Sequence, residues 1–310
     1  MKIVFFGNTD FGIPTLDLLK DQKFNILATI TNTDKKVGRG KSLKETSIKK
    51  WATYNDVKLI QQDYLKDKLF IDKLSMLKAD FFIVIAYKLL PPEIFTLPKY
   101  GTINLHASLL PLYRGAAPIQ RAILNNDSET GISTFIINEK IDTGSIILQE
   151  KILINNQNYG ELHHELAVRG APLVISSIDH ITNKKPLIIQ KNKSTYAYKI
   201  NKSETQIDWK MGANHILNLI RAFSPYPGAY TYLEGKRVRI LKALRAEFSL
   251  ENLEPGDVSI HNKCIYVGTK NSVLQVKELQ LEGKKTMSGS SFINGYLRNV
   301  EKIFKFEKGQ

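Results

Sequence analysis

Asn104 and His106 are the two residues of this sequence whose types and spacing point most directly to chemistry. They lie two positions apart in the apolar run TINLHAS, which predicts a strand over 102–108, so both side chains project from one face. An asparagine amide donates hydrogen bonds to an oxygen, and a histidine can donate one or transfer a proton. The pair could therefore form an oxyanion hole for an acyl-transfer intermediate, whereas an isolated Asn-x-His pair is more often structural.

Asp142 provides the acid that such a pair needs. It lies in the sequence IDTG (141–144), a glycine-containing loop between two predicted strands. A carboxylate beside His106 would hold the imidazole in its protonated form, fix its tautomer and assist removal of a proton. No Ser-His-Asp elbow and no metal-ligand spacing in the sequence competes with this interpretation.

The first half of the chain must position these residues, and its hydropathy pattern is that of an α/β fold. Short apolar runs alternate with segments that carry apolar residues at helical spacing. Strands this continuously apolar are usually covered on both faces, which predicts a Rossmann-like, mostly parallel sheet with helices on each side. Such sheets bind ligands at the carboxyl ends of their strands, where Asn104 and His106 are expected. The predicted strands are 2–6, 25–31, 79–87, 102–108, 130–137 and 145–154, and the predicted helices are 13–22, 46–56, 65–78 and 116–127.

Two further features of this half refine the prediction. Residues 159–183 have helical periodicity, and Gly170-Ala171-Pro172 is expected to split them into two helices, because proline fits a helix start better than an interior. The first turn, GNTDFGIP (7–14), lacks G-x-G-x-x-G and an acidic residue at the dinucleotide spacing. We interpret it as a tight strand-to-helix turn rather than an NAD site.

The second half of the chain has a different pattern. Residues 186–205 are polar and basic without periodicity, which is typical of a linker between domains. A short helix is predicted within 211–223, and the strands 228–235, 236–243, 256–260, 263–269 and 272–280 follow it. Short strands separated by turn residues indicate a small β-barrel or sandwich. We therefore expect domains at 1–185 and 206–310, joined by a linker at 186–205.

Basic residues exceed acidic ones by 44 to 30, and the excess is unevenly distributed. Residues 31–50 carry seven basic residues against two acidic ones, a net charge of +5, and residues 201–250 carry a net charge of +4. Residues 101–150, which hold the candidate chemistry, have a net charge of −2. This distribution indicates a phosphate-rich ligand that spans two regions, with ordinary solvated lysines as the alternative.

Several classes of protein are excluded by simple features. A single cysteine, Cys264, permits neither an internal disulfide framework nor a cysteine-based metal cluster, and we expect it in the core. The start MKIVFFG is unlike a signal peptide, and no apolar run approaches the roughly 18 residues that span a bilayer. We therefore expect a cytoplasmic protein. The remaining histidines, His163, His164, His180, His215 and His261, are interpreted as structural.

The segment NLHASLLPLYRGAAPIQRAI (104–123) resembles the signature of methionyl-tRNA formyltransferases, within the wider group of 10-formyltetrahydrofolate-dependent transformylases. Further similarity lies in MKIVFFGNTDFG, VIAYKLLP, ETGISTF, TYAYKINKSETQIDW and IRAFSPYPGAY, which together cover nearly the whole chain. SLLPxYRG alone would be shared with sugar-nucleotide formyltransferases, whereas GAAPIQRAI and the basic second half are similar to the tRNA enzyme. The resemblance implies formyl transfer to the α-amine of methionyl-initiator-tRNA.

The resemblance also implies roles for the three candidate catalytic residues. Asn104 and His106 would stabilise the oxyanion as the amine attacks the formyl carbon. Asp142 would keep His106 protonated and help to accept the amine proton, directly or through water. The amine is itself the nucleophile, so the implied reaction needs neither a covalent enzyme intermediate nor a metal.

A folate site is implied along residues 84–91, where backbone groups could pair with the pterin ring. The family pattern has glycine where this chain has Lys88, which would be strained there if the glycine adopts a positive φ. The residues implied for folate binding are Ala86, Tyr87, Lys88, Leu89, Ser108, Leu109, Leu110 and Pro111.

Two basic regions are implied to contact tRNA. The loop 31–50 corresponds to the family's insertion that meets the acceptor end, and Arg39, flanked by Gly38 and Gly40, could pair bidentately with phosphate. The second half is similar to an OB-fold, which binds nucleic acid through a basic face. The residues implied are Lys35, Lys36, Arg39, Lys41, Lys236, Arg237, Arg239, Lys242 and Arg245.

Two alternative functions compete with this one. The same chemistry on a small amine, such as a ribonucleotide or a sugar nucleotide, explains Asn104, His106 and Asp142 but leaves both basic regions unused. A nonenzymatic RNA-binding protein on a degenerate transformylase fold explains the charge but not the intact catalytic residues. We favour the tRNA enzyme and expect a monomer.

Overall fold

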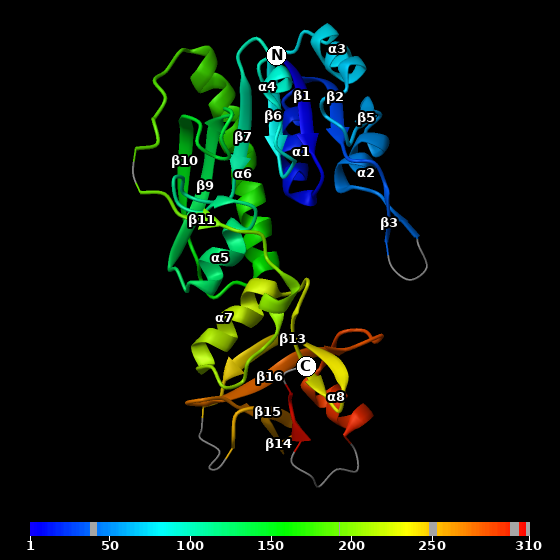
Figure 1. The fold of residues 1–310 in the computed structure, drawn as a ribbon, viewed down its shortest axis with the longest axis vertical. Helices are drawn as coiled ribbons and strands as arrows, with labels where there is room; N and C mark the ends of the chain where they lie inside the picture. The colour runs from blue at the N-terminus through cyan, green and yellow to red at the C-terminus, as the bar shows by residue number, and fades with distance from the viewer. Residues whose placement is uncertain (38–41, 192, 248–252, 298–303, 308–310) are drawn as a thin grey trace. The chain divides into compact units, whose positions relative to one another are not determined.

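The computed structural model describes residues 1–37, 42–191, 193–247, 253–297 and 304–307, and it divides into two compact units (Figure 1). Arg39 and Lys41, which are expected to contact tRNA, lie outside the described residues. The domain boundaries expected at 185 and 205 stay a prediction. The first unit comprises Met1–Pro118, Glu129–Leu153 and His163–Tyr198, and the second comprises Ile119–Ser128, Ile154–Leu162 and Lys199–Gln310.

A seven-stranded sheet forms the centre of the first unit, with the strand order β10-β9-β7-β6-β1-β2-β5. The five strands from β7 to β5 run parallel, and β9 and β10 are antiparallel to their neighbours. The predicted Rossmann-like, mostly parallel sheet is therefore confirmed. The strands are β1 (Lys2–Gly7), β2 (Asn25–Thr31), β5 (Leu59–Gln61), β6 (Phe81–Ile85), β7 (Thr102–His106), β9 (Glu129–Ile136) and β10 (Ile146–Leu153).

Burial on both faces explains why these strands are continuously apolar. Every residue of β6 is buried, and successive residues of β1, including Phe5 and Phe6, have no exposed surface. Phe6 packs against Phe82 of β6 with ring centroids 5.2 Å apart. Helices accompany the strands as the apolar spacing predicts. They are α1 (Ile13–Asp21), α2 (Ser47–Tyr54), α3 (Lys68–Met76), α4 (Pro92–Phe95), α5 (Pro118–Leu124) and α6 (Tyr159–Thr182).

Helix α6 is one continuous helix, so the expected break at Gly170-Ala171-Pro172 is wrong. Pro172 has no N–H, so the carbonyl of Val168, four residues earlier, lacks its helical donor. Both residues are exposed, and water can hydrate that carbonyl. Gly170 faces the sheet, and a Cβ there would approach the Leu105 side chain to 2.5 Å. The glycine thus lets the helix pack closely on β7 rather than ending it.

Two short strand pairs lie in segments that the sequence pattern left irregular. Within the basic region 31–50, β3 (Lys35–Val37) and β4 (Ser42–Lys44) pair antiparallel as a hairpin. Within and near the expected linker, β11 (Tyr196–Ala197) pairs parallel with β8 (Arg114–Gly115). Pairs of two or three residues show no periodicity, so pattern alone could not find them.

The second unit is built on an antiparallel sheet with the order β12-β13-β16-β15-β14-β18, and β17 pairs with β16. Its core includes Trp209, Phe223 of α7 and Phe292 of α8, each at most 4% exposed. The expected small β domain is confirmed. Its elements are α7 (Ala213–Phe223), β12 (Ala229–Leu233), β13 (Lys236–Arg245), β14 (Asp257–His261), β15 (Cys264–Gly268), β16 (Val273–Leu281), β17 (Met287–Ser288), α8 (Gly289–Tyr296) and β18 (Phe304–Lys305).

Candidate active site

Strand β7 carries Asn104 and His106 to the carboxyl edge of the parallel strands. It is hydrogen-bonded between β6 and β9, with Asn104 opposite Val84 on one side and Phe135 on the other. His106 is 8% exposed, and Asn104 is half-buried. Among the hydrogen bonds of the described residues, none uses the Asn104 side chain. Its amide therefore keeps its donors for a bound oxygen.

Both ring nitrogens of His106 face oxygen atoms. Nε2 lies 2.8 Å from the carbonyl oxygen of Tyr113, and Nδ1 lies 3.7 Å from Oδ2 of Asp142. A carbonyl can only accept, so Nε2 carries a proton and donates it, which fixes the ring orientation. The distance from Nδ1 to the carboxylate exceeds a direct hydrogen bond, so a proton on Nδ1 can also reach a third oxygen.

The loop between β9 and β10 holds Asp142 beside the histidine. Asp142 adopts a left-handed conformation with φ of 51°, and its Oδ2 accepts the backbone N–H of Gly115 at 2.7 Å. A Cβ at Gly144 would lie 1.7 Å from the carbonyl oxygen of Ile136, so the loop requires glycine there. The structure thereby brings the three predicted catalytic residues into one unit with fixed positions for His106 and Asp142.

Arg114 and Gln190 support this loop and were missed by sequence reasoning. The Gln190 amide donates to the backbone carbonyls of Asp142 at 3.0 Å and of Gly144 at 2.7 Å. Its oxygen accepts from the guanidinium of Arg114, which is 9% exposed, with distances of 3.1 Å to Nε and 2.6 Å to Nη2. Arg114 belongs to the quoted motif SLLPLYRG, which was a usable signal, whereas Gln190 lies in the nonperiodic segment 186–205 and gave none.

A second set of hydrogen bonds shapes the turn SLLP (108–111). The Ser133 hydroxyl donates to the carbonyl of Ser108 at 2.6 Å and accepts the backbone N–H of Leu110 at 3.0 Å. Gln149 donates to the carbonyl of Leu110 at 2.9 Å. The fully buried Ser108 hydroxyl donates to the carbonyl of Leu112, so its polar group serves the turn itself. Leu109 and Pro111 are half-buried, which leaves them as the accessible members of the turn.

The segment after β6 differs from expectation at one position. Ala86, not Lys88, has the left-handed conformation, with φ of 49°, so the conditional expectation of strain at Lys88 is not met. Ala86 and Leu89 are exposed, and Tyr87 and Lys88 are half-buried. Burial raises the pKa of the Tyr87 hydroxyl, which donates to the carbonyl of Gln62 at 3.2 Å.

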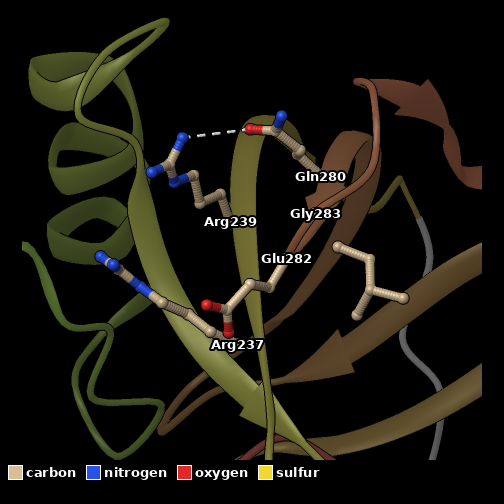
Figure 2. A pocket seen from close by; sticks show the side chains of 6 residues that line it. Arg237, Arg239, Gln280, Glu282 and Gly283 are labelled. Carbon is tan, nitrogen blue, oxygen red and sulfur yellow. Dashed lines mark hydrogen bonds between the residues drawn. The ribbon is translucent and has the colours of Figure 1, made fainter. Parts of the chain in front are cut away.

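The cationic residues predicted for tRNA lie in both units. In the first unit, Lys35 and Lys36 are exposed on β3. In the second unit, Arg237 and Arg239 extend from β13 into a pocket with Gln280, Glu282 and Gly283 (Figure 2). Arg239 donates to Gln280 at 3.2 Å.

Arg237 is held by an aromatic ring rather than by an acid. Its guanidinium lies 3.8 Å from the ring centroid of Tyr230, and its buried Nε has no hydrogen-bonding partner in the described structure. Lys236, Lys242 and Arg245 are exposed on the same strand. Lys242 and Arg245 line a separate pocket of about 640 Å³. Four of the five cations of β13 therefore form two pairs, Arg237 with Arg239 and Lys242 with Arg245, rather than one uniform face.

Known protein families match the chain along most of its length. The formyl transferase model matches residues 1–171, and the model of the formyl transferase C-terminal domain matches residues 199–297. The chain belongs to the formyl transferase family. The methionyl-tRNA formyltransferase of Thermodesulfovibrio yellowstonii is 43% identical over 298 residues, covering 94% of this chain and 95% of that protein. That of Flavobacterium johnsoniae is 39% identical over 302 residues, covering 95% and 96%.

Solved structures share the formyl transferase fold at lower sequence identity. The methionyl-tRNA formyltransferase of Clostridium thermocellum has a TM-score of 0.56 and 16% identity, covering 91% of this chain and 98% of that one. HypX of Aquifex aeolicus, in complex with tetrahydrofolic acid, has a TM-score of 0.67 and 15% identity. The match covers all of this chain and 51% of HypX. As a family member, the chain is a formyl-transfer enzyme.

Two further features of the described residues concern metal ions and membranes. No group of three or more His, Cys, Asp or Glu side chains in that part of the formyl transferase chain is arranged to hold a metal ion. Likewise, none of the helices that the structure describes has the length and apolar character needed to cross a membrane.

Proposed function

We propose that this enzyme transfers the formyl group of 10-formyltetrahydrofolate to the α-amino group of methionyl-initiator-tRNA, giving N-formylmethionyl-tRNA for translation initiation. The observation that carries the proposal is the arrangement around His106. Its Nε2 is fixed by the Tyr113 carbonyl, and its Nδ1 faces the Asp142 carboxylate. Asn104 lies on the same strand, and its amide makes no hydrogen bond to the residues that the structure describes. The names of the relatives supply the expected substrates.

These residues can perform the steps of amine formylation. As the amine nitrogen bonds to the formyl carbon, the carbonyl oxygen gains negative charge, and Asn104 and the Nδ1 proton of His106 donate to it. The Asp142 carboxylate balances the charge of the imidazolium and accepts the amine proton, directly or through water. When the tetrahedral intermediate collapses, the carbonyl re-forms, the C–N bond to the folate breaks, and the leaving nitrogen takes up the proton that Asp142 accepted, directly or through water. One such oxyanion donor is typically worth ~3–4 kcal/mol of transition-state stabilisation.

The folate cosubstrate is assigned to the segments 86–89 and 108–111, which follow the neighbouring strands β6 and β7. Within the described chain, the backbone groups of 87–89 take part in none of the turn and loop hydrogen bonds, so they remain available to a pterin ring. The exposed Leu89 offers apolar contact beside them. Ser108 and Leu110, both buried, would act by shaping the turn rather than by touching the ligand.

The tRNA partner is assigned to the two basic regions. Lys35 and Lys36 on the exposed hairpin and the cations of β13 provide positive charge in both units. Formylation of a small amine would leave these residues without a role, which favours the tRNA substrate. We also propose the domain boundaries 1–185 and 206–310, action in the cytoplasm, where translation starts, and a monomeric enzyme.

A formylation assay tests the proposed function directly. Purified enzyme and 10-formyltetrahydrofolate are incubated with methionyl-initiator-tRNA, with the same tRNA uncharged, and with small amines that include an amino sugar nucleotide. We expect formyl transfer to the charged tRNA alone. Faster transfer to the sugar nucleotide would support the small-amine alternative, and tRNA binding without any transfer would support a nonenzymatic RNA-binding protein.

A further inference from the structure

The ends of three parallel strands meet at Gln62 and Asp63, directly after β5. From the β2 side, the backbone N–H of Thr33 donates to Oδ1 of Asp63 at 3.3 Å, and its hydroxyl donates to Oδ2. From the β6 side, Nζ of Lys88 donates to the carbonyl oxygens of Asp63 at 2.6 Å and Gln62 at 3.2 Å. One two-residue segment therefore binds the loops that follow β2 and β6.

The contact from the β6 side is made by two consecutive residues. The Lys88 ammonium also lies 3.8 Å from Oδ1 of Asp63 and 5.5 Å from the ring centroid of Tyr87. Tyr87 itself donates to the Gln62 carbonyl. Burial lowers the pKa of Lys88, and the Asp63 carboxylate opposes this effect. The lysine thus fixes the segment 86–89 to the loop that follows β5.

The contact from the β2 side leads straight into the basic hairpin. Thr33 lies two residues before β3, whose first residue is Lys35. Asp34, which lies between Thr33 and Lys35, pairs with Lys49 and accepts a hydrogen bond from the Gln61 amide at 2.9 Å. The positive charge of Lys35 acts electrostatically on both Asp63 and Lys88. An anion bound at Lys35 would therefore change the field at the residues that hold 86–89.

We propose that Thr33, Asp63 and Lys88 are positioning residues that couple the two substrate sites, so that tRNA bound on the hairpin strengthens binding of the folate at 86–89. This inference rests on the proposed function, which places folate at 86–89 and tRNA on the hairpin. A tRNA phosphate that neutralises Lys35 removes the repulsion between Lys35 and the Lys88 ammonium, so Lys88 bonds more firmly to the carbonyls of Gln62 and Asp63 and holds the segment 86–89. Thr33 keeps Asp63 in place for this contact. By thermodynamic linkage, folate strengthens tRNA binding by the same factor.

The test measures this coupling directly with a ligand pair that cannot react. The Kd of tetrahydrofolate is measured by calorimetry for the full-length enzyme, alone and with saturating methionyl-initiator-tRNA. The ratio of the two Kd values is the coupling factor, and a loss of intrinsic folate affinity in a variant cancels from it. We expect a factor of about five for the unmodified enzyme, at the lower end of typical allosteric coupling.

We call the contacts that join Thr33, Asp63 and Lys88 the relay. Two variants each remove one end of it. Lys88→Met keeps an unbranched apolar stem but removes the ammonium that donates to the carbonyls of Gln62 and Asp63. Thr33→Val removes the hydroxyl that donates to the Asp63 carboxylate. Each is expected to bring the coupling factor close to one, and the double variant is expected to lose nothing further because both act on one path. Lys66→Met is the matched control, because Lys66 is exposed three residues from Asp63 and outside the relay. It should keep the full factor.

The outcomes separate this inference from the proposed function. A factor near one in the unmodified enzyme, with both ligands bound, overturns the coupling and leaves the proposed function intact. A factor that survives in Lys88→Met or Thr33→Val assigns these residues a merely structural role and also overturns it. Failure of the unmodified enzyme to bind either ligand contradicts the proposed function itself. Melting temperatures of the variants, measured alongside, verify that each is folded.

Discussion

His106 and Asp142 face each other across 3.7 Å, although 36 positions of sequence separate them and they come from β7 and from the loop between β9 and β10. Each is fixed by a backbone group from the segment 113–115: the Tyr113 carbonyl holds the ring, and the Gly115 N–H holds the carboxylate. At this distance Nδ1 makes no direct hydrogen bond to the carboxylate, so a proton on Nδ1 can be donated to a substrate oxygen. From this geometry we predict how substitutions at the surrounding residues change turnover and stability.

Replacing Asn104 with alanine should lower kcat by about 10²–10³-fold, because one oxyanion donor is lost. The half-buried side chain makes no hydrogen bond within the described structure, so thermal stability should change little. Steady-state formylation and a melting curve measure the two effects. A kcat within twofold of the unmodified enzyme would remove Asn104 from the proposed mechanism.

Asp142→Asn separates the charge of this carboxylate from its structural contact. The amide oxygen can still accept the Gly115 N–H, whereas the negative charge and the proton acceptor are gone. We expect kcat to fall by orders of magnitude, with melting temperature preserved. Asp142→Ala should lose similar activity and, in addition, some stability, because the Gly115 N–H is left without its acceptor. Equal activity of Asp142→Asn and the unmodified enzyme would exclude Asp142 as the acid–base residue.

The sequence could predict the sheet because burial imposes a pattern on it. Strand β2 was predicted at its observed bounds, and β6 and β7 within two residues, since strands covered on both faces must be apolar throughout. The continuous helix α6 was mispredicted because proline propensity was weighed without the packing of Gly170 on Leu105. Tertiary contact decided that element.

The candidate site was predictable only where a motif marked it. Asn104, His106 and Asp142 were selected from residue type and spacing, and the structure places all three in the first unit. Gln190 could not be found, because its bond to the Asp142 carbonyl spans 48 positions and its own segment has no pattern. The left-handed conformation of Ala86, just after β6, could not be predicted either, since nothing in the sequence Ala-Tyr-Lys specifies which residue adopts a positive φ.

Gln190→Ala should reduce both stability and turnover. It removes the acceptor of the buried Arg114 guanidinium and the donor that fixes the Asp142 loop. Leaving such a buried donor unsatisfied costs about 1–3 kcal/mol of unfolding free energy. We expect kcat to fall while KM for tRNA stays unchanged, because Gln190 acts through Asp142. Gln190→Glu keeps the acceptor for Arg114 and should recover much of the stability but less of the turnover.

The pair of Asp34 and Lys49 should make stability sensitive to acid. Hydrogen bonds from Lys49 and Gln61 lower the pKa of Asp34 below its ordinary value of 3.8. A lowered carboxyl pKa contributes stability above the unfolded-state value, and this contribution is lost as pH falls through the folded-state value. Unfolding free energy should therefore fall below about pH 4 less steeply in Asp34→Asn than in the unmodified enzyme. Parallel curves for the two proteins in urea titrations at several pH values would contradict the assignment.

Neutralising the cations of β13 should flatten the salt dependence of tRNA binding. Each neutralised phosphate contact contributes about −0.9 to the slope of log K against log salt concentration for a duplex. The slope should therefore become shallower by several units in a variant with five cations changed to glutamine, namely Lys236, Arg237, Arg239, Lys242 and Arg245. Arg245→Ala alone should make the slope shallower by about one unit or less, because Arg245 also bonds to Asn214.

The control variant changes Lys263 and Lys270, which are exposed in the same unit, and should keep the slope. An unchanged slope in the five-residue variant would count against β13 as a tRNA surface. Since Arg237 stacks on Tyr230, its replacement should also lower the melting temperature, which distinguishes its packing from its charge.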